Sequence, residues 1–256
     1  MRPIDIFKSH LKEKKALKII SGIDNFDINK AKMVVESATI AKASAVDVAC
    51  SEDIIKMAKN ITNLPVFASS VIAQNLVDAV NFGADAIEIG NFDVLYRKGQ
   101  IFSAKQVLDL TIETLNLLGS KKNDIFISVT IPGHISIDQQ ISLAQELEKL
   151  NIDLIQTEGA QIADVKSSNA RGLLEIANVS ISNTIELSRN TSIPIMTASG
   201  ITPTTAKLAF AAGASAIGVG SCVNKLSSSI EMIAVISSLR EIISSSNNVV
   251  DNFVSC

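Results

Sequence analysis

Two stretches of the chain repeat one pattern, and this repeat limits the choice of fold more than any other feature. Residues 65–71 (PVFASSV) resemble residues 194–200 (PIMTASG), and residues 83–90 (GADAIEIG) resemble residues 213–220 (GASAIGVG). The two offsets differ by one residue, which a single insertion in a loop or helix explains. A repeated strand–helix–strand unit is what the two halves of a (β/α)₈ barrel would show.

Short apolar runs alternate with helical patterns from end to end, as in a parallel sheet built from βαβ units. We expect eight strands, at residues 17–22, 45–49, 65–69, 86–90, 125–130, 154–157, 194–199 and 216–220. Helical periodicity is clearest at 28–43 and 137–150, and a short helix at 5–13 precedes the first strand. The sequence therefore predicts one α/β domain over residues 1–256, a single (β/α)₈ TIM barrel, with a frayed tail from about 245 to 256.

An open doubly wound sheet is the alternative. Its first βα turn normally carries the pattern Gly-x-Gly-x-x-Gly. Residues 21–25 (SGIDN) do not match that pattern, so the barrel is favoured.

Composition narrows the class of partner. Hydrophobic residues make up 47% of the 256 residues, and the mean hydropathy of +0.32 fits strands that are covered on both faces. No run approaches the roughly 18 apolar residues that a membrane span needs. The net charge is −3 with mixed signs, and the chain has one Tyr and no Trp. We therefore expect a small-molecule partner, no nucleic acid and no membrane, and leave a homo-oligomer open.

The cysteines and the start of the chain bear on location. Cys50, Cys222 and Cys256 show no paired spacing, so a disulfide framework is not expected and a reducing compartment is the default. Residues 2–7 (RPIDIF) resemble neither a secretory signal nor a transit peptide. We expect the protein to work where it is made.

The loops after the last two strands predict a phosphate-sized anion site. In such barrels function lies on the loops that follow the strands. Glycines there let a ligand approach the backbone, and Pro203 in a first helical turn, with Thr202 as its cap, would offer free N–H groups. Tight turns alone would also explain the glycines. The candidate phosphate-binding residues are Ser199, Gly200, Ile201, Thr202, Gly218, Gly220 and Ser221.

Polar residues recur at one register of alternate strands. Asp47, Glu88, Gln156 and Gly218 would contribute to a common layer inside the barrel. A carboxylate there is costly unless it is paired or used, and two facing carboxylates could raise one another's pKa. Asp47 and Glu88 are therefore candidate acids or bases, or else members of a structural polar network.

Two further candidates lie at strand ends. His134 follows the fifth strand in Pro132-Gly133-His134 and could move protons near neutral pH, or could be a solvated loop residue. Glu158 follows the sixth strand and is either a catalytic or a loop-ordering carboxylate.

Lysines and metal-ligand patterns are less informative. Lys18 lies near the start of the first strand, at the face associated with stability, and Lys166 lies in a loop. A Schiff-base mechanism thus has no obvious nucleophile. No trio of His, Asp and Glu has zinc-like spacing, so no metal site is predicted. The cofactor stays unknown.

The chain resembles a known family. The resemblance is clearest in residues 7–22, 130–134 (TIPGH), 156–159 (QTEG), and the pair 197–200 (TASG) and 218–221 (GVGS). It covers nearly the whole chain. They resemble the hypothetical chloroplast reading-frame twenty-three family of algal plastids and cyanobacteria, which is grouped with aldolase-type barrels and has no established activity. The resemblance implies a plastid protein of the stroma. The phosphate pair alone resembles thiazole synthase and phosphosugar isomerase and lyase barrels, although the strand-borne lysine expected of thiazole synthase is missing.

Two functions remain open. One is an enzyme, an isomerase or lyase without a Schiff-base lysine, that acts on a small phosphorylated metabolite by proton transfer. The other is a non-catalytic or regulatory barrel that binds such a metabolite.

Overall fold

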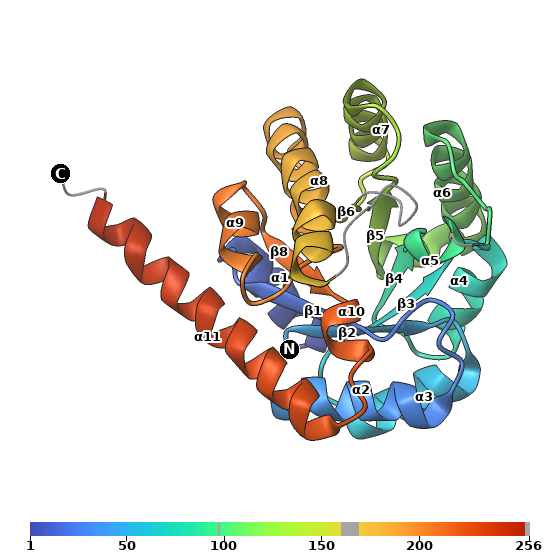
Figure 1. Cartoon of the computed structure of the whole chain (residues 1–256). Coiled ribbons are helices and arrows are strands. Elements are labelled where there is room, and N and C mark those ends of the chain that lie inside the picture. The colour runs from blue at the N-terminus through green and yellow to red at the C-terminus, as the bar shows by residue number, and fades with distance from the viewer. Residues whose placement is uncertain (97, 160–168, 254–256) are drawn as a thin grey trace.

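A computed structural model describes residues 1–96, 98–159 and 169–253. Within these ranges the strands form a closed parallel barrel in the order β1 to β8, ringed by helices (Figure 1). The strands are β1 (Ala16–Ile20), β2 (Ala45–Ala49), β3 (Val66–Ser70), β4 (Ala86–Ile89), β5 (Phe126–Ile131), β6 (Leu154–Thr157), β7 (Ile195–Thr197) and β8 (Ala216–Val219). The predicted (β/α)₈ barrel is confirmed.

The helices lie between the strands and at both ends of the chain. They are α1 (Pro3–Lys12), α2 (Ile28–Ile40), α3 (Glu52–Ile61), α4 (Ala73–Asn81), α5 (Asp93–Tyr96), α6 (Ala104–Leu118), the 3₁₀ helix η1 (Gly119–Asn123), α7 (Ile137–Lys149), α8 (Asn169–Asn190), α9 (Ala206–Ala211), α10 (Ser221–Asn224) and α11 (Ser229–Phe253). Pro65 and Pro194 stand directly before β3 and β7, at matching places in the repeat.

Local chemistry fixes several helix starts. The side chain of Asp27 accepts hydrogen bonds from the backbone N–H groups of Asn29 and Lys30 at the start of α2. Ser136 forms a capping box with Gln139 at the start of α7. A side-chain acceptor at this position satisfies N–H groups that the helix itself leaves unpaired, and it stabilises the helix by about 1 kcal/mol.

The helix expected around Pro203 begins later than predicted. Residues 203–205 form a turn, α9 starts at Ala206, and Thr205 is its N-cap. The hydroxyl of Thr205 accepts a hydrogen bond from Thr202 N at 2.9 Å and donates to the carbonyl of Gly200 at 3.1 Å. These bonds hold the loop in a turn, so the prediction that Thr202 caps a helix with Pro203 in its first turn is wrong.

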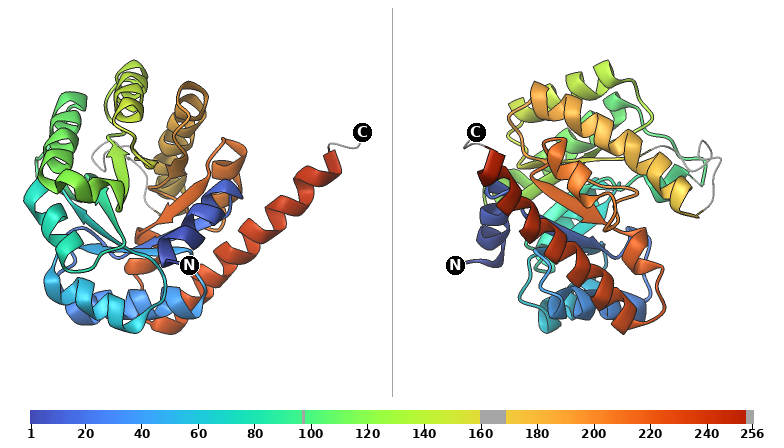
Figure 2. Two further views of the ribbon diagram at one scale, coloured as in Figure 1. Left: turned by 180° about the vertical axis from the view of Figure 1, so that it is seen from behind. Right: turned by 60° about the vertical axis from the view of Figure 1, so that its left-hand side comes forward.

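The amino end of the barrel is filled by apolar side chains. Phe7 of α1 packs edge-on against Phe67 and Phe126, with ring centroids 5.2 and 5.7 Å apart. Ile4 and Leu11 of α1 join the same buried cluster. Figure 2 shows α1 at the opposite end of the barrel from α10. Helix α1 therefore covers the floor of the barrel and leaves the carboxyl ends of the strands for the site.

Helix α11 closes the ring next to α2 and α9 and runs on through Phe253, away from the barrel (Figure 1). The frayed tail stays a prediction. Among the described residues, no helix is long and apolar enough to cross a membrane.

Candidate functional site

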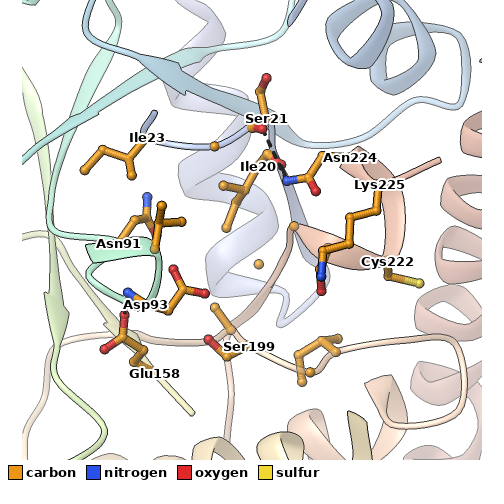
Figure 3. Close-up of a pocket in the computed structure, with 18 of the residues that line it drawn as sticks. Ile20, Ser21, Ile23, Asn91, Asp93, Glu158, Ser199, Cys222, Asn224 and Lys225 are labelled. Carbon is orange, nitrogen blue, oxygen red and sulfur yellow. Dashed lines mark hydrogen bonds between the residues drawn. The ribbon is translucent and has the colours of Figure 1, made fainter. Parts of the chain in front are cut away.

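A cavity of about 840 Å³ opens at the carboxyl ends of the strands (Figure 3). Its walls come from the loops after β1, β4, β6, β7 and β8. Its lining includes one of the predicted carboxylates, Glu158. It also includes six residues of the predicted anion site: Ser199, Gly200, Ile201, Gly218, Gly220 and Ser221. Thr202 does not belong to the described lining, and its N–H already donates to Thr205. The two predicted glycine-bearing loops thus meet in one cavity.

The strand ends at β7 and β8 differ in backbone conformation. Ser199 and Gly200 both have positive φ, at 70° and 72°, which is rare for a serine. Gly220 has ordinary φ, and a Cβ placed there would meet no atom nearer than 3.7 Å. A side chain at 220 would therefore begin with ordinary van der Waals contacts, whereas the Ser199–Gly200 pair bends the chain at the mouth of the cavity.

Cationic side chains also reach the cavity. Lys30 from α2 and the exposed Lys225 after α10 are part of its lining. Asn224 is held in place because its amide donates to the carbonyls of Ile20 and Ser21, at 3.0 and 3.2 Å (Figure 3). These contacts fasten the β8 loop to the end of β1.

Glu158 is the predicted carboxylate that belongs to the lining of the cavity. It is 2% exposed and lies beside Asp93 (Figure 3). One of its oxygens accepts a hydrogen bond from Asp93 N at 2.8 Å, and the other accepts from the hydroxyl of Tyr96. Burial, reinforced by the Asp93 carboxylate, raises the pKa of Glu158 to about 8, against the opposing effect of these hydrogen bonds and one from the backbone of Gly133. Near neutral pH this group can therefore give or take a proton.

The turn after β5 lies against the strand end that carries Glu158. A Cβ on Gly133 would come within 2.3 Å of the carbonyl oxygen of Gly159, so only glycine allows this approach. His134 packs edge-on against Tyr96, with ring centroids 5.2 Å apart, and is not among the described lining residues. His134 thus lies behind the Tyr96–Glu158 pair.

Asp47 and Glu88 point into the barrel, as the register predicts. They lie below the cavity and are 1% and 0% exposed. Between them lies Lys18, whose Nζ is 3.0 Å from Asp47 Oδ2 and 2.9 Å from Glu88 Oε2. The two carboxylates are therefore joined through a buried cation.

The prediction for Lys18 is wrong, because its side chain lies inside the barrel at the level of both carboxylates and not at the amino-terminal face. Burial lowers the pKa of Lys18, but Asp47 and Glu88 more than offset this and raise it above the usual value. Lys18 is fully buried and does not belong to the lining of the cavity among the described residues. Burial raises the pKa of Glu88, and Lys18 opposes that rise. Lys166 lies outside the described residues.

Amide and hydroxyl groups connect this ion-paired cluster to the cavity. The Asn91 amide donates to Ser69 Oγ at 2.8 Å and to Asp47 Oδ2 at 3.3 Å. Thr130 donates to Glu88 Oε1 at 2.8 Å. Gln156 donates to Asn91 Oδ1 and, at 3.0 Å, to Thr130 Oγ1. Asn91 and Gln156 line the cavity, so the network reaches from its floor into the barrel. The inward orientation predicted for Gln156 is confirmed.

The remaining polar candidates give no second site. Among the described residues, no group of three or more His, Cys, Asp or Glu side chains could hold a metal ion. Cys50 and Cys222 are free thiols whose pKa values burial raises, and Cys256 lies outside the described residues.

Fold and site together define a (β/α)₈ barrel with a polar cavity at the carboxyl ends of its strands. Residues 4–249 match the family described as "Protein of unknown function (DUF561)", and the chain belongs to that family. The resemblance seen in the sequence is confirmed by relatives named "Uncharacterized protein ycf23". The one from Porphyra purpurea is 33% identical over 244 residues (95% of this chain and 91% of that protein), and the one from Cyanophora paradoxa is 37% identical over 235 residues (90% and 93%). The name ycf23 belongs to plastid genomes, which indicates a plastid location.

Solved structures support the fold. The 3-hexulose-6-phosphate synthase of Salmonella typhimurium superposes with a TM-score of 0.65 at 14% identity, covering 90% of this chain and 99% of that chain. The (S)-3-O-geranylgeranylglyceryl phosphate synthase of Thermoplasma acidophilum, solved with its substrate sn-glycerol-1-phosphate, gives a TM-score of 0.59 at 16% identity, covering 96% and 99%. At these identities the likeness concerns the fold alone.

Proposed function

We propose that this protein is an enzyme of the plastid stroma that binds a small phosphorylated metabolite and isomerises or cleaves it by proton transfer. The observation that carries the proposal is the shared cavity. Six residues predicted to bind phosphate line the same space as Glu158, a buried carboxyl with a pKa raised to about 8. Perturbed acids in clefts are typical of catalytic sites.

The phosphate would lie between the loops at Ser199–Ile201 and Gly220–Ser221. Gly200 and Gly220 carry no Cβ, so an anion could approach the backbone N–H groups of both loops. Lys30 and Lys225 add positive charge to the same cavity. Two structural neighbours have names that include phosphorylated compounds, in agreement with an anion at this end of the barrel.

Glu158 would transfer the proton. Tyr96 donates to Glu158, and burial together with the Glu158 carboxylate raises the pKa of Tyr96, so the tyrosine keeps its proton and acts as a fixed donor. His134 contacts Tyr96 and would orient it. Asp47 and Glu88 would act from below, through the network that ends at Asn91 and Gln156.

Binding without catalysis is a second candidate. Each oxygen of Glu158 already accepts a hydrogen bond from the protein, an arrangement that also suits a carboxyl that only orders its loop. The regulatory or metabolite-binding barrel considered from the sequence would have this geometry.

One experiment tests both candidates. Native mass spectrometry of purified protein first identifies a co-purifying phosphate ester. That ester is then incubated with the protein in D₂O, and loss of its C–H signals is followed by proton NMR. We expect exchange with the wild type and a roughly 10²- to 10⁴-fold slower exchange with Glu158→Gln at unchanged ester affinity. Binding with no exchange would establish the non-catalytic barrel, and no phosphate binding at all would refute both.

A further inference from the structure

The carbonyl oxygen of the Gln156 side chain stands apart from every other polar atom of the network. Gln156 is 2% exposed, and among the described residues none donates a hydrogen bond to its Oε1. A buried acceptor without a partner is costly in a folded protein. Gln156 is also a lining residue of the cavity, so a bound molecule could supply the donor.

The orientation of this amide follows from the ion pairs below it. Lys18 is a cation and can only donate, so Asp47 next to it accepts. Ser69 gives its hydroxyl proton to Asp47, which leaves the serine oxygen as an acceptor. The Asn91 group that faces Ser69 and Asp47 must then be its NH₂, and Asn91 Oδ1 is turned toward Gln156.

A second chain of hydrogen bonds, through Glu88 and Thr130, requires the same orientation of the Gln156 amide. Lys18 also donates to Glu88, and Glu88 Oε1 accepts the hydroxyl proton of Thr130. The Thr130 oxygen can then only accept from Gln156. Both neighbours of Gln156 require its NH₂ group, so neither path allows the amide to turn over and its Oε1 is held away from the network.

The residue beside this oxygen is a glycine that packs closely against it. Gly218 of β8 lines the cavity, and a Cβ on it would lie 3.3 Å from Gln156 Oε1 and 3.1 Å from the Cβ of Ala198. Any larger residue would crowd the carbonyl. Gly220, two residues on, borders the proposed phosphate position in the same cavity.

We infer that Gln156 is a specificity-determining residue that accepts a hydrogen bond from the phosphorylated ligand. This inference rests on the proposed function. Lys18, Asp47 and Glu88 are positioning residues that fix the amide. The ligand class is a phosphate ester with a hydroxyl or amino donor on its carbon chain, as in polyol and sugar phosphates. An ester whose chain is purely hydrocarbon would leave the carbonyl unpaired and bind more weakly.

The test uses two matched pairs of probes that differ only in hydroxyl groups. Glycerol 3-phosphate is compared with propyl phosphate, and ribitol 5-phosphate with pentyl phosphate, by calorimetric titration of the full chain. Inorganic phosphate is titrated alongside as a probe of the anion site alone. We expect at least one hydroxylated ester to bind about tenfold more tightly than its alkyl partner, the worth of one hydrogen bond.

Gln156→Met should remove this preference and leave the affinity for inorganic phosphate within twofold. The matched control is Gln140→Met. Gln140 of α7 is also 2% exposed with no described donor to its Oε1, but it lies outside the described lining. It should keep the full preference.

The outcomes separate the two proposals. If phosphate binds but neither pair is discriminated by the wild type, the role of Gln156 is refuted and the anion site stands. A preference that survives in Gln156→Met refutes it as well. If neither phosphate nor any ester binds, both the proposed function and the role of Gln156 are refuted. Should Gln156→Met not fold, the wild-type comparison alone decides.

Discussion

The unit of β3, α4 and β4 and the unit of β7, α9 and β8 come from one repeated sequence pattern, yet they place different side chains inside the barrel. The first contributes Ser69 and Glu88 to the buried network, where the second has Ala198 and Gly218 at the aligned positions. Polar groups fill the barrel on one side, and small residues on the other leave the wall of the cavity open. One sequence pattern thus forms a buried polar network on one side of the barrel and part of the cavity wall on the other.

The two aligned strand-end glycines show the same contrast. Gly90 has φ of 132°, and a Cβ on it would lie 2.5 Å from the Cβ of Thr130. Gly220 has neither constraint. A positive φ and packing therefore require glycine at 90, and neither reason applies at 220.

The largest effect on stability should come from Lys18, whose charge balances the buried carboxylates of Asp47 and Glu88. Lys18→Met leaves Asp47 and Glu88 buried without their cation, and we expect the free energy of unfolding to fall by roughly 3–5 kcal/mol. Urea unfolding measures it. The surface pair Lys56–Glu52 is the control, and Lys56→Met should cost less than about 1 kcal/mol. Equal losses would mean that the interior pair contributes no more than an exposed one.

Alanine substitutions at Gly90 and Gly220 should differ in their effect on the free energy of unfolding. Gly90→Ala meets both an unfavourable φ and a clash with Thr130, and we expect a loss of roughly 2–4 kcal/mol in unfolding free energy. Gly220→Ala should stay within about 0.5 kcal/mol of the wild type. Chemical denaturation of both variants checks this, and a loss at 220 as large as that at 90 would remove the contrast.

A charge at position 220 tests its binding role. Gly220→Asp places a negative group beside the proposed phosphate position, and losing one or two charge-assisted hydrogen bonds should weaken inorganic phosphate binding by roughly 10- to 10³-fold. Gly90→Asp cannot serve as the control because the clash at 90 threatens the fold. Ser120→Asp can, because it adds the same charge on η1, at the amino end of the barrel. Unchanged binding in Gly220→Asp would leave these glycines as turn formers.

The last comparison concerns pH and two buried carboxyls: Glu88, which pairs with Lys18, and Glu158, which has no cationic partner among the described residues. The pKa of Glu158 is about 8 in the fold, against a usual 4.5, so the folded state holds this proton more tightly than the unfolded state does. Its contribution to stability is complete below pH 4.5 and is lost as the pH rises to about 8, by at most ~1.4 kcal/mol per pH unit. Glu158→Gln should flatten the decline in melting temperature over that range. A parallel decline in both proteins would show that Glu158 does not titrate there.

The sequence was sufficient for the barrel because every strand is a short apolar run and the repeat ties distant strands together. It also placed Asp47, Glu88 and Gln156 inside, since strand side chains alternate between two faces. Lys18 was missed because its partners lie on β2 and β4, and the stagger between strands that brings them level is a property of the closed sheet. The turn before α9 was missed because the Thr205 hydroxyl bonds locally to Gly200 and Thr202, which no spacing rule reveals.

The aromatic packing under the barrel has a kinetic consequence. Phe7, Phe67 and Phe126 fill the amino end of the barrel, and the cavity is lined by loops at the carboxyl ends of the strands. Under the proposed function, substrate would enter and product would leave at this end. Substrate and product would exclude one another, so product inhibition should be competitive, and the rate of departure through that shared passage would set an upper limit on turnover.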